Sequence, residues 1–143
     1  KPAFNDQKDF LDYFNLNHKL KNLKVITQGD YYSILKDSTV VIGFNSTAIF
    51  EALARGTEVI VPQFGECKQK KYKPYFIDFK KSSAKIASTK ESFQKIMHNI
   101  LIKKPKFKNE ISKEDKLLLD KWVGNSDGKS NERLISALKK ELY

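Results

Sequence analysis

Three consecutive polar residues, Asn45, Ser46 and Thr47, carry the side chains in this sequence best placed to bind an anion. They stand between an apolar run, residues 40–42, and the segment 48–54, whose apolar residues have helical spacing. Amides at a helix N-terminus, together with the positive end of the helix dipole, bind phosphate, and hydroxyl groups can add donors. The alternative is that Asn45 or Ser46 only caps the helix. Because the two roles are compatible, the turn is a candidate phosphate site in either case.

Glu51 and Gly65 are the second and third candidates. Glu51 follows Thr47 by one helical turn, and a carboxylate there could accept hydrogen bonds from both hydroxyls of a ribose. Alternatively, it is a solvated glutamate or pairs with Arg55 at the i+4 position. Gly65 opens a lysine-rich loop after the apolar run 59–61. A lysine of that loop could meet a second phosphate, although most of these lysines could equally be solvated.

The elements that would position these residues form a parallel sheet. Segments 24–27, 39–44 and 58–62 have the composition of short buried strands, with Val41 and Ile60 expected in the interior. Helical segments separate them, so consecutive strands should be adjacent, parallel and joined by right-handed crossovers. We therefore expect an α/β fold: a Rossmann-like parallel sheet with flanking helices. The turn and the loop would then lie at the carboxyl edge of the sheet, where such proteins bind ligands.

Helix signals occupy the rest of the chain. Ser88 and Glu91 have the spacing of a capping box, and apolar residues recur at helical spacing from Phe93 to Leu101. Gly56 suits the left-handed residue after a helix C-terminus. The segment 85–87 is expected to be a short last strand. The other expected helix caps are Asn5, Asp30 and Ser112.

The composition and charge of the chain narrow the classes of binding site and partner that it can have. The chain has 143 residues, of which 40% are hydrophobic, which suits one domain spanning residues 1–143. Its net charge of +10 arises entirely after residue 65. Such a basic region attracts phosphates, anionic lipid or nucleic acid, or is simply a solvated surface. The single cysteine, Cys67, excludes an internal disulfide and a cysteine-based zinc site. We expect no metal site, no cofactor and no transmembrane run of ~18 apolar residues.

The stretch 38–65 resembles the donor-binding half of GT-B glycosyltransferases, particularly bacterial enzymes of capsule and surface-polysaccharide assembly. The similarity lies in the strand TVVIGF, the polar turn NST, the helix AIFEALARG with Glu51, and the strand EVIVP. A weaker similarity is DGKSNER at residues 127–133. The resemblance implies two Rossmann-like domains, with the active site in the cleft between them. Unlike many relatives, the turn lacks glycines, and no histidine or arginine of obvious catalytic role precedes it.

Carried over by position, the resemblance implies that the turn amides lie near a diphosphate and that Glu51 binds the ribose. The donor-binding residues would be Asn45, Ser46, Thr47, Glu51 and Gly65. The chain would be a glycosyltransferase fragment that lacks the N-terminal acceptor domain and is inactive alone. Its partners would be a nucleotide-sugar donor and a glycan or lipid-linked acceptor. We expect a cytoplasmic location, with peripheral association to the anionic inner face of the cell membrane. No residue is assigned as the catalytic base.

Two alternatives remain. A nucleotide-sugar epimerase can share the GT-B architecture. A non-catalytic basic module could instead bind nucleic acid or an anionic membrane, with Tyr72, Tyr75 and Phe76 stacking on bases. No nucleic-acid-binding motif is present, so nucleic acid is not an expected partner.

Overall fold

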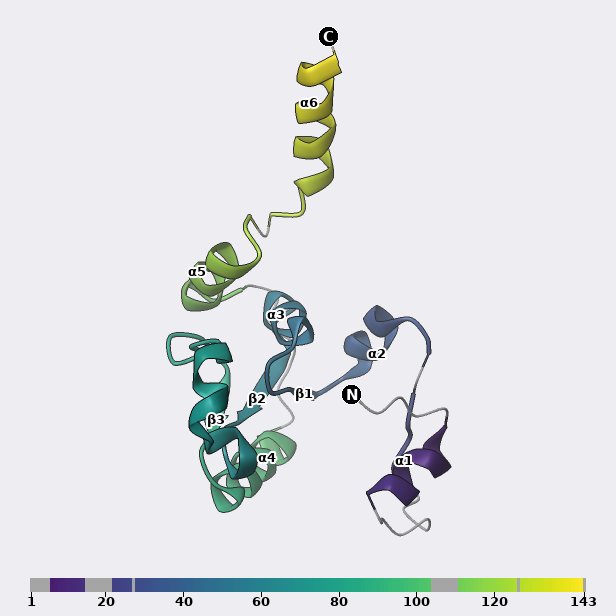
Figure 1. The fold of residues 1–143 in the computed structure, drawn as a ribbon, viewed down its shortest axis with the longest axis vertical. Coiled ribbons are helices and arrows are strands. Elements are labelled where there is room, and N and C mark those ends of the chain that lie inside the picture. Colours follow the sequence, from purple (N-terminus) through teal and green to yellow (C-terminus); the bar gives the residue numbers. More distant parts are fainter. Residues whose placement is uncertain (1–5, 15–21, 27, 104–110, 126, 143) are drawn as a thin grey trace. The chain divides into compact units, whose positions relative to one another are not determined.

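The computed structural model describes residues 6–14, 22–26, 28–103, 111–125 and 127–142. The chain divides into two units, Lys1–Lys36 and Asp37–Tyr143 (Figure 1). The second unit contains the whole sheet and all five candidate site residues.

Two short helices, α1 (Gln7–Tyr13) and α2 (Tyr31–Asp37), begin in the first unit. Asp6 caps α1, since its side chain accepts a hydrogen bond from the Asp9 amide at 2.9 Å. Asn5, the expected cap, lies outside the described residues. Asp30 caps α2 as predicted: the Ser33 hydroxyl and the Tyr32 amide donate to its carboxylate at 2.7 and 3.0 Å. These two hydrogen bonds lower the pKa of Asp30.

The prediction of a strand at residues 24–27 is wrong for residues 24–26, the part that the structure describes. Residues 24–26 are neither helix nor strand, and Ile26 is 45% exposed; Thr27 lies outside the described residues. The β-branched residues Val25 and Ile26 favour extended backbone, but such a short segment becomes a strand only when another strand pairs with it. No described strand pairs with residues 24–26. The expected first βαβ unit is therefore not formed by the described residues.

The described sheet has three strands, β1 (Val40–Ile42), β2 (Glu58–Pro62) and β3 (Lys85–Ala87), in the order β1-β2-β3. Both pairings are parallel, with Val41 opposite Val59 and Val61 opposite Ile86. The predictions that segments 39–44 and 58–62 contain adjacent parallel strands, and that 85–87 forms the last one, are confirmed. Helix α3 (Thr47–Ala54) connects β1 to β2.

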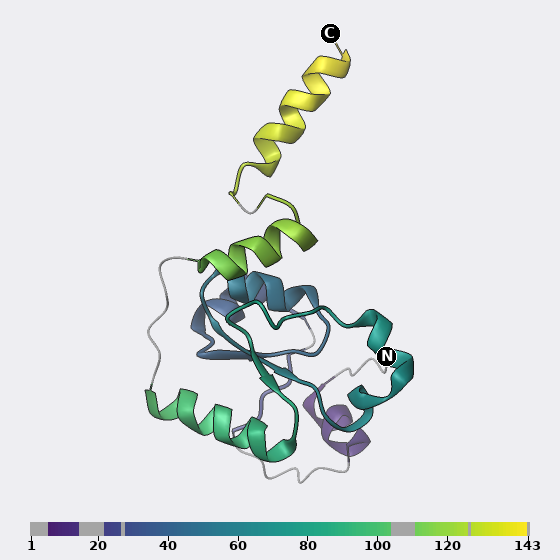
Figure 2. The ribbon, with the colours of Figure 1, turned by 90° about the vertical axis from the view of Figure 1, so that its left-hand side faces the viewer.

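Helices cover both faces of this sheet. Figure 2 shows α3 on one side, with α5 (Lys113–Trp122) beyond it, and α4 (Lys90–Lys103) on the other side. The α3 and α5 helices are joined through the rings of Phe50 and Trp122, whose centroids are 6.4 Å apart. The α4 side of the core contains Ile60, Ala87 and Ile100, all buried. The remaining elements are two 3₁₀ helices, η1 (Gly65–Lys68) and η2 (Lys70–Tyr75), and helix α6 (Ser130–Leu142).

Burial differs between the two strands that were expected to be interior. Ile60 in β2 is fully buried, as predicted, but Val41 in β1 is only half-buried and Ile42 is 47% exposed. The expectation that the 40–42 run is a buried strand, with Val41 in the interior, is therefore wrong. The reason is position: β1 is an edge strand of the described sheet, and α4 packs mainly on β2 and β3.

The capping box of α4 forms one residue later than predicted. The Ser92 amide donates to Thr89 Oγ1 at 3.1 Å, and the Thr89 amide donates to Ser92 Oγ at 3.0 Å. Thr89 and Ser92, rather than Ser88 and Glu91, therefore make the reciprocal pair of hydrogen bonds. The predictions at Ser112 and Gly56 are confirmed. Ser112 accepts a hydrogen bond from the Asp115 amide at 3.0 Å, and Gly56 has a positive φ of 74°.

Candidate functional site

The polar turn lies between the end of β1 and the start of α3. Ser46 is the N-cap of α3: the Ala48 amide donates to its Oγ at 3.3 Å, and the Ile49 amide to its carbonyl oxygen at 3.1 Å. The prediction that this turn caps the helix is confirmed. Asn45, Ser46 and Thr47 are all exposed. The turn can therefore present hydroxyl groups and first-turn amides of α3 to an anion.

Gly43 is a positioning residue that sequence reasoning missed. A Cβ atom at Gly43 would lie 2.8 Å from Ile49 Cγ1, which is closer than carbon atoms pack. The Gly43 amide also donates to the Ile60 carbonyl at 3.2 Å, which extends the β1–β2 ladder by one bond. Because Gly43 has no side chain, the start of α3 can pack tightly against the end of β1. A glycine directly after a strand is a sequence signal for such a close approach.

Glu51 lies on α3, four residues after Thr47, and is half-buried. Residues four apart share one side of a helix, and four residues advance about 6 Å along its axis. The parallel topology places the start of α3 at the carboxyl edge of the sheet. The spacing between Thr47 and Glu51 is therefore compatible with a phosphate at one and a ribose at the other.

Gly65 opens the loop that follows β2, at the same carboxyl edge. Its φ of +63° is left-handed, a backbone conformation that favours glycine, and apart from its chain neighbours no described residue has an atom within 4 Å of the place where a Cβ would be. Three exposed lysines follow: Lys68, Lys70 and Lys71. Phe76, just after η2, packs edge to face against Phe44, the residue that precedes the polar turn. Their ring centroids are 5.0 Å apart. The structure thus brings the turn at residues 45–47 and the lysine-bearing loop to one edge.

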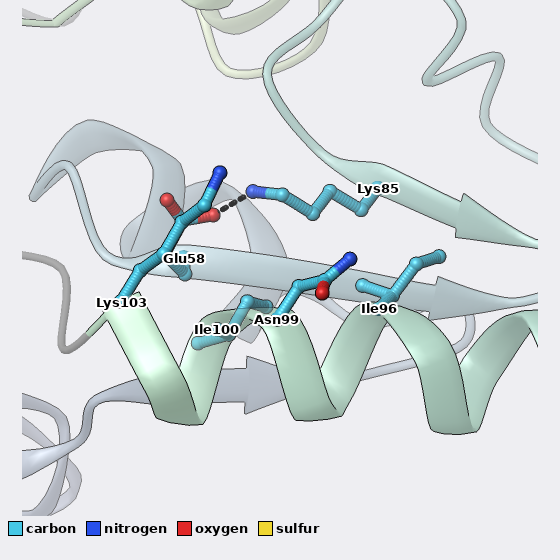
Figure 3. A pocket seen from close by; sticks show the side chains of 6 residues that line it. All are labelled: Glu58, Lys85, Ile96, Asn99, Ile100 and Lys103. Atoms are coloured by element: carbon cyan, nitrogen blue, oxygen red, sulfur yellow. Dashed lines mark hydrogen bonds and ion pairs between the residues drawn. The ribbon is translucent and has the colours of Figure 1, made fainter.

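A cavity of about 270 Å³ lies at the opposite, amino edge of the sheet, and none of the five candidate residues lines it. Figure 3 shows an ion pair between Glu58 and Lys85 on neighbouring strands, facing Asn99 and Lys103 of α4. Glu58 neutralises Lys85, and Lys103 lies at the negative end of the α4 dipole. The surplus of positive charge in this cavity is therefore small, and the cavity is poorly suited to a diphosphate.

The 127–133 segment forms a local hydrogen-bond network at the N-terminal end of α6. Both carboxylate oxygens of Asp127 accept hydrogen bonds from Arg133 Nη1, at 2.9 and 2.8 Å, and one also accepts the Lys129 amide at 3.0 Å. The Arg133 side chain, followed by the Lys129 amide, holds the pKa of Asp127 below its usual value. The Asp127 carboxylate in turn raises the pKa of Arg133. In this structure, then, the two residues pair with each other and join the turn before α6 to the first turn of that helix.

Neither a cluster of metal-binding side chains nor a membrane-spanning helix is found in the described part of the chain. Its histidine, cysteine and acidic residues make no group of three or more that could hold a metal ion. None of its helices combines the length and the apolar character needed to cross a bilayer.

Comparison of the chain with protein-family models, with curated proteins and with solved structures gave no match. The mixed α/β architecture, with a small parallel sheet and flanking helices, is shown by the structure itself. It is consistent with a Rossmann-like arrangement.

Proposed function

We propose that this chain is the donor-binding domain of a glycosyltransferase that assembles a surface polysaccharide. One observation carries the proposal: the parallel β1-α3-β2 unit, with the polar turn at its carboxyl edge and Glu51 one helical turn further. This is the place where open α/β sheets bind ligands. The similarity of residues 38–65 to donor-binding domains supplies the ligand class.

In this proposal the turn at residues 45–47 binds the diphosphate of a nucleotide-sugar. The first-turn amides of α3 and the hydroxyls of Ser46 and Thr47 donate to phosphate oxygens, and the helix dipole favours their negative charge. Glu51 accepts hydrogen bonds from the ribose. As the bond between the sugar and the diphosphate breaks, negative charge grows on the departing phosphate. Donors fixed at that position, joined by a lysine of the loop after Gly65, stabilise this charge.

The acceptor and the catalytic base belong to a second domain in this proposal. A glycan or a lipid-linked acceptor would enter a cleft between the two domains, on the cytoplasmic side of the membrane. The excess of lysine and arginine after residue 65 would hold the enzyme at an anionic membrane surface.

A nucleotide titration followed by amide NMR tests the proposal. Uridine, cytidine and guanosine diphosphates would each be added to the 143-residue chain, with inorganic pyrophosphate as the comparison. We expect at least one nucleotide to shift the amides of residues 43–51 and 63–66, and pyrophosphate to shift the turn more than Glu51. Shifts confined to Glu58, Lys85 and α4, or none for any nucleotide at millimolar concentration, would contradict the proposal.

A further inference from the structure

The hydroxyl group of Thr57 is buried without a partner. Thr57 lies between α3 and β2, is 4% exposed, and donates its amide to the Ala52 carbonyl at 2.9 Å. Its Oγ1 makes no hydrogen bond with any residue that the structure describes. Buried side-chain hydroxyls in folded proteins nearly always have a partner, either protein or ordered water. A specific partner for Thr57 is therefore to be expected.

A buried carboxylate lies beside the same site. Asp115, near the start of α5, is also 4% exposed. Its two oxygens accept hydrogen bonds from the Ser83 amide at 2.8 Å and the Ser112 hydroxyl at 2.7 Å. Within the described ranges, no lysine, arginine or histidine pairs with it. A carboxylate offers about four lone-pair sites, so these two bonds leave it able to accept more.

Thr57 and Asp115 both line one small cavity. Its volume is about 10 Å³, and Gly56, Ser83 and Ser112 contribute to the same wall. A volume of this size corresponds to roughly one water molecule, and a buried water needs two to four polar partners. Thr57, with its unpaired hydroxyl, and Asp115, with spare acceptor sites, thus line one cavity that has room for a single water molecule.

We propose that one ordered water molecule occupies this cavity and joins Thr57 Oγ1 to the Asp115 carboxylate. It donates one hydrogen to the Asp115 carboxylate. Its second hydrogen bond is with the threonine hydroxyl, as acceptor of the hydroxyl hydrogen or as donor to Oγ1. The water therefore links the end of α3, the loop before β3 and the start of α5. This role is independent of the proposed donor site, because it concerns how α5 is fastened to the β1-α3-β2 unit.

Crystal structures of wild type, Thr57→Val and Thr57→Ser test the assignment. Valine keeps the shape of threonine but removes the hydroxyl, whereas serine keeps the hydroxyl. We expect a single density peak within hydrogen-bond distance of both residues in wild type and Thr57→Ser, and no peak in Thr57→Val. A wild-type crystal structure without that peak, or with the Thr57 hydroxyl bonded to a protein atom, overturns the proposal.

Thermal unfolding gives a second, independent readout. Thr57→Val should lower the unfolding midpoint by roughly 3–8 °C, since Asp115 loses a hydrogen-bond donor. The matched control is Thr39→Val, at an exposed threonine, which should change the midpoint little. An unchanged or raised midpoint for Thr57→Val overturns the proposal. So does a wild-type midpoint that is higher in sodium chloride than in tetramethylammonium chloride of equal ionic strength when Thr57→Val shows no such difference, because that result assigns the cavity to a cation.

Discussion

A Cβ atom on Gly43 would lie 2.8 Å from Cγ1 and 3.1 Å from Cδ1 of Ile49, whose side chain is fully buried. Gly43 therefore lies close against the Ile49 side chain. Gly43 follows β1 and Ile49 lies in the first turn of α3, so this close approach spans the polar turn between them. It therefore ties the position of the proposed phosphate-binding amides to the packing of the core.

Gly43→Ala tests this coupling. Because Ile49 cannot move freely, the added methyl group should lower the free energy of unfolding by about 1–3 kcal/mol, the usual cost of overpacking. In an Ile49→Ala background the methyl group has room, so the same substitution should cost clearly less. Urea unfolding of the four proteins of this double-mutant cycle measures the difference. An equal cost in both backgrounds would show that the contact does not determine the position of the turn.

Acidification should weaken the Asp127–Arg133 ion pair at the start of α6. The pKa of Asp127 is held below its ordinary value of 3.8 by the Arg133 side chain and the Lys129 amide. A lowered folded-state pKa contributes stability that is present above the unfolded-state pKa and is lost as pH falls through the folded value. We expect the helical order of residues 130–133, followed by carbon chemical shifts, to decrease below about pH 4. Asp127→Asn should abolish this pH dependence, and an identical acid transition in that variant would contradict the assignment.

The shifted capping box of α4 predicts different effects for neighbouring residues. Thr89→Ala removes the N-cap side chain and should lower the free energy of unfolding by about 1 kcal/mol. Ser88→Ala is the matched control: Ser88 is exposed, so its loss should change stability by less than about 0.5 kcal/mol. Chemical denaturation of both variants measures this. A larger loss for Ser88→Ala than for Thr89→Ala would restore the box predicted from sequence.

The proposed membrane association depends on charge and should therefore depend on salt. Vesicles rich in anionic lipid should co-sediment with the chain at low ionic strength, and much less at 0.5 M salt, where charges are screened within a few ångströms. Vesicles of neutral lipid are the control. Binding that is insensitive to salt, or equal for neutral vesicles, would exclude the electrostatic account.

The central β1-α3-β2 unit was predictable because several signals coincide there. The apolar runs, the Ser46 cap and Gly56 after the helix all specify the same boundaries, and the structure agrees with each. In contrast, residues 24–26 carried only β-propensity, which has no effect without a pairing strand. The edge position of β1 could not be read from its composition either. Its apolar run resembles that of a central strand, and Ile42 is nevertheless 47% exposed.

The α4 cap shows a different limit. The sequence Ser88-Thr89-Lys90-Glu91-Ser92 contains two overlapping pairs with capping-box spacing, and the structure forms the second. At the candidate site, the predicted order of strand and helix put the polar turn and the loop at Gly65 at the carboxyl edge of the sheet, and the parallel β1-β2 pairing agrees with that order. Gly43 follows the apolar run 40–42 and could have been noted, but its packing partner Ile49 is known only from the structure. Nucleotide binding by these residues stays a prediction.

The most direct measurement for that prediction is calorimetric titration of the nucleoside diphosphate identified by NMR into wild type, Glu51→Ala and Glu132→Ala. Glu132 is an exposed glutamate on α6 and supplies the charge-matched control. If Glu51 binds the ribose, Glu51→Ala should weaken binding by about 1–3 kcal/mol, or roughly 5- to 150-fold in Kd, with unfolding nearly unchanged. Glu132→Ala should bind like wild type. A Glu51→Ala protein that binds the nucleotide as tightly as wild type would contradict the proposed donor site.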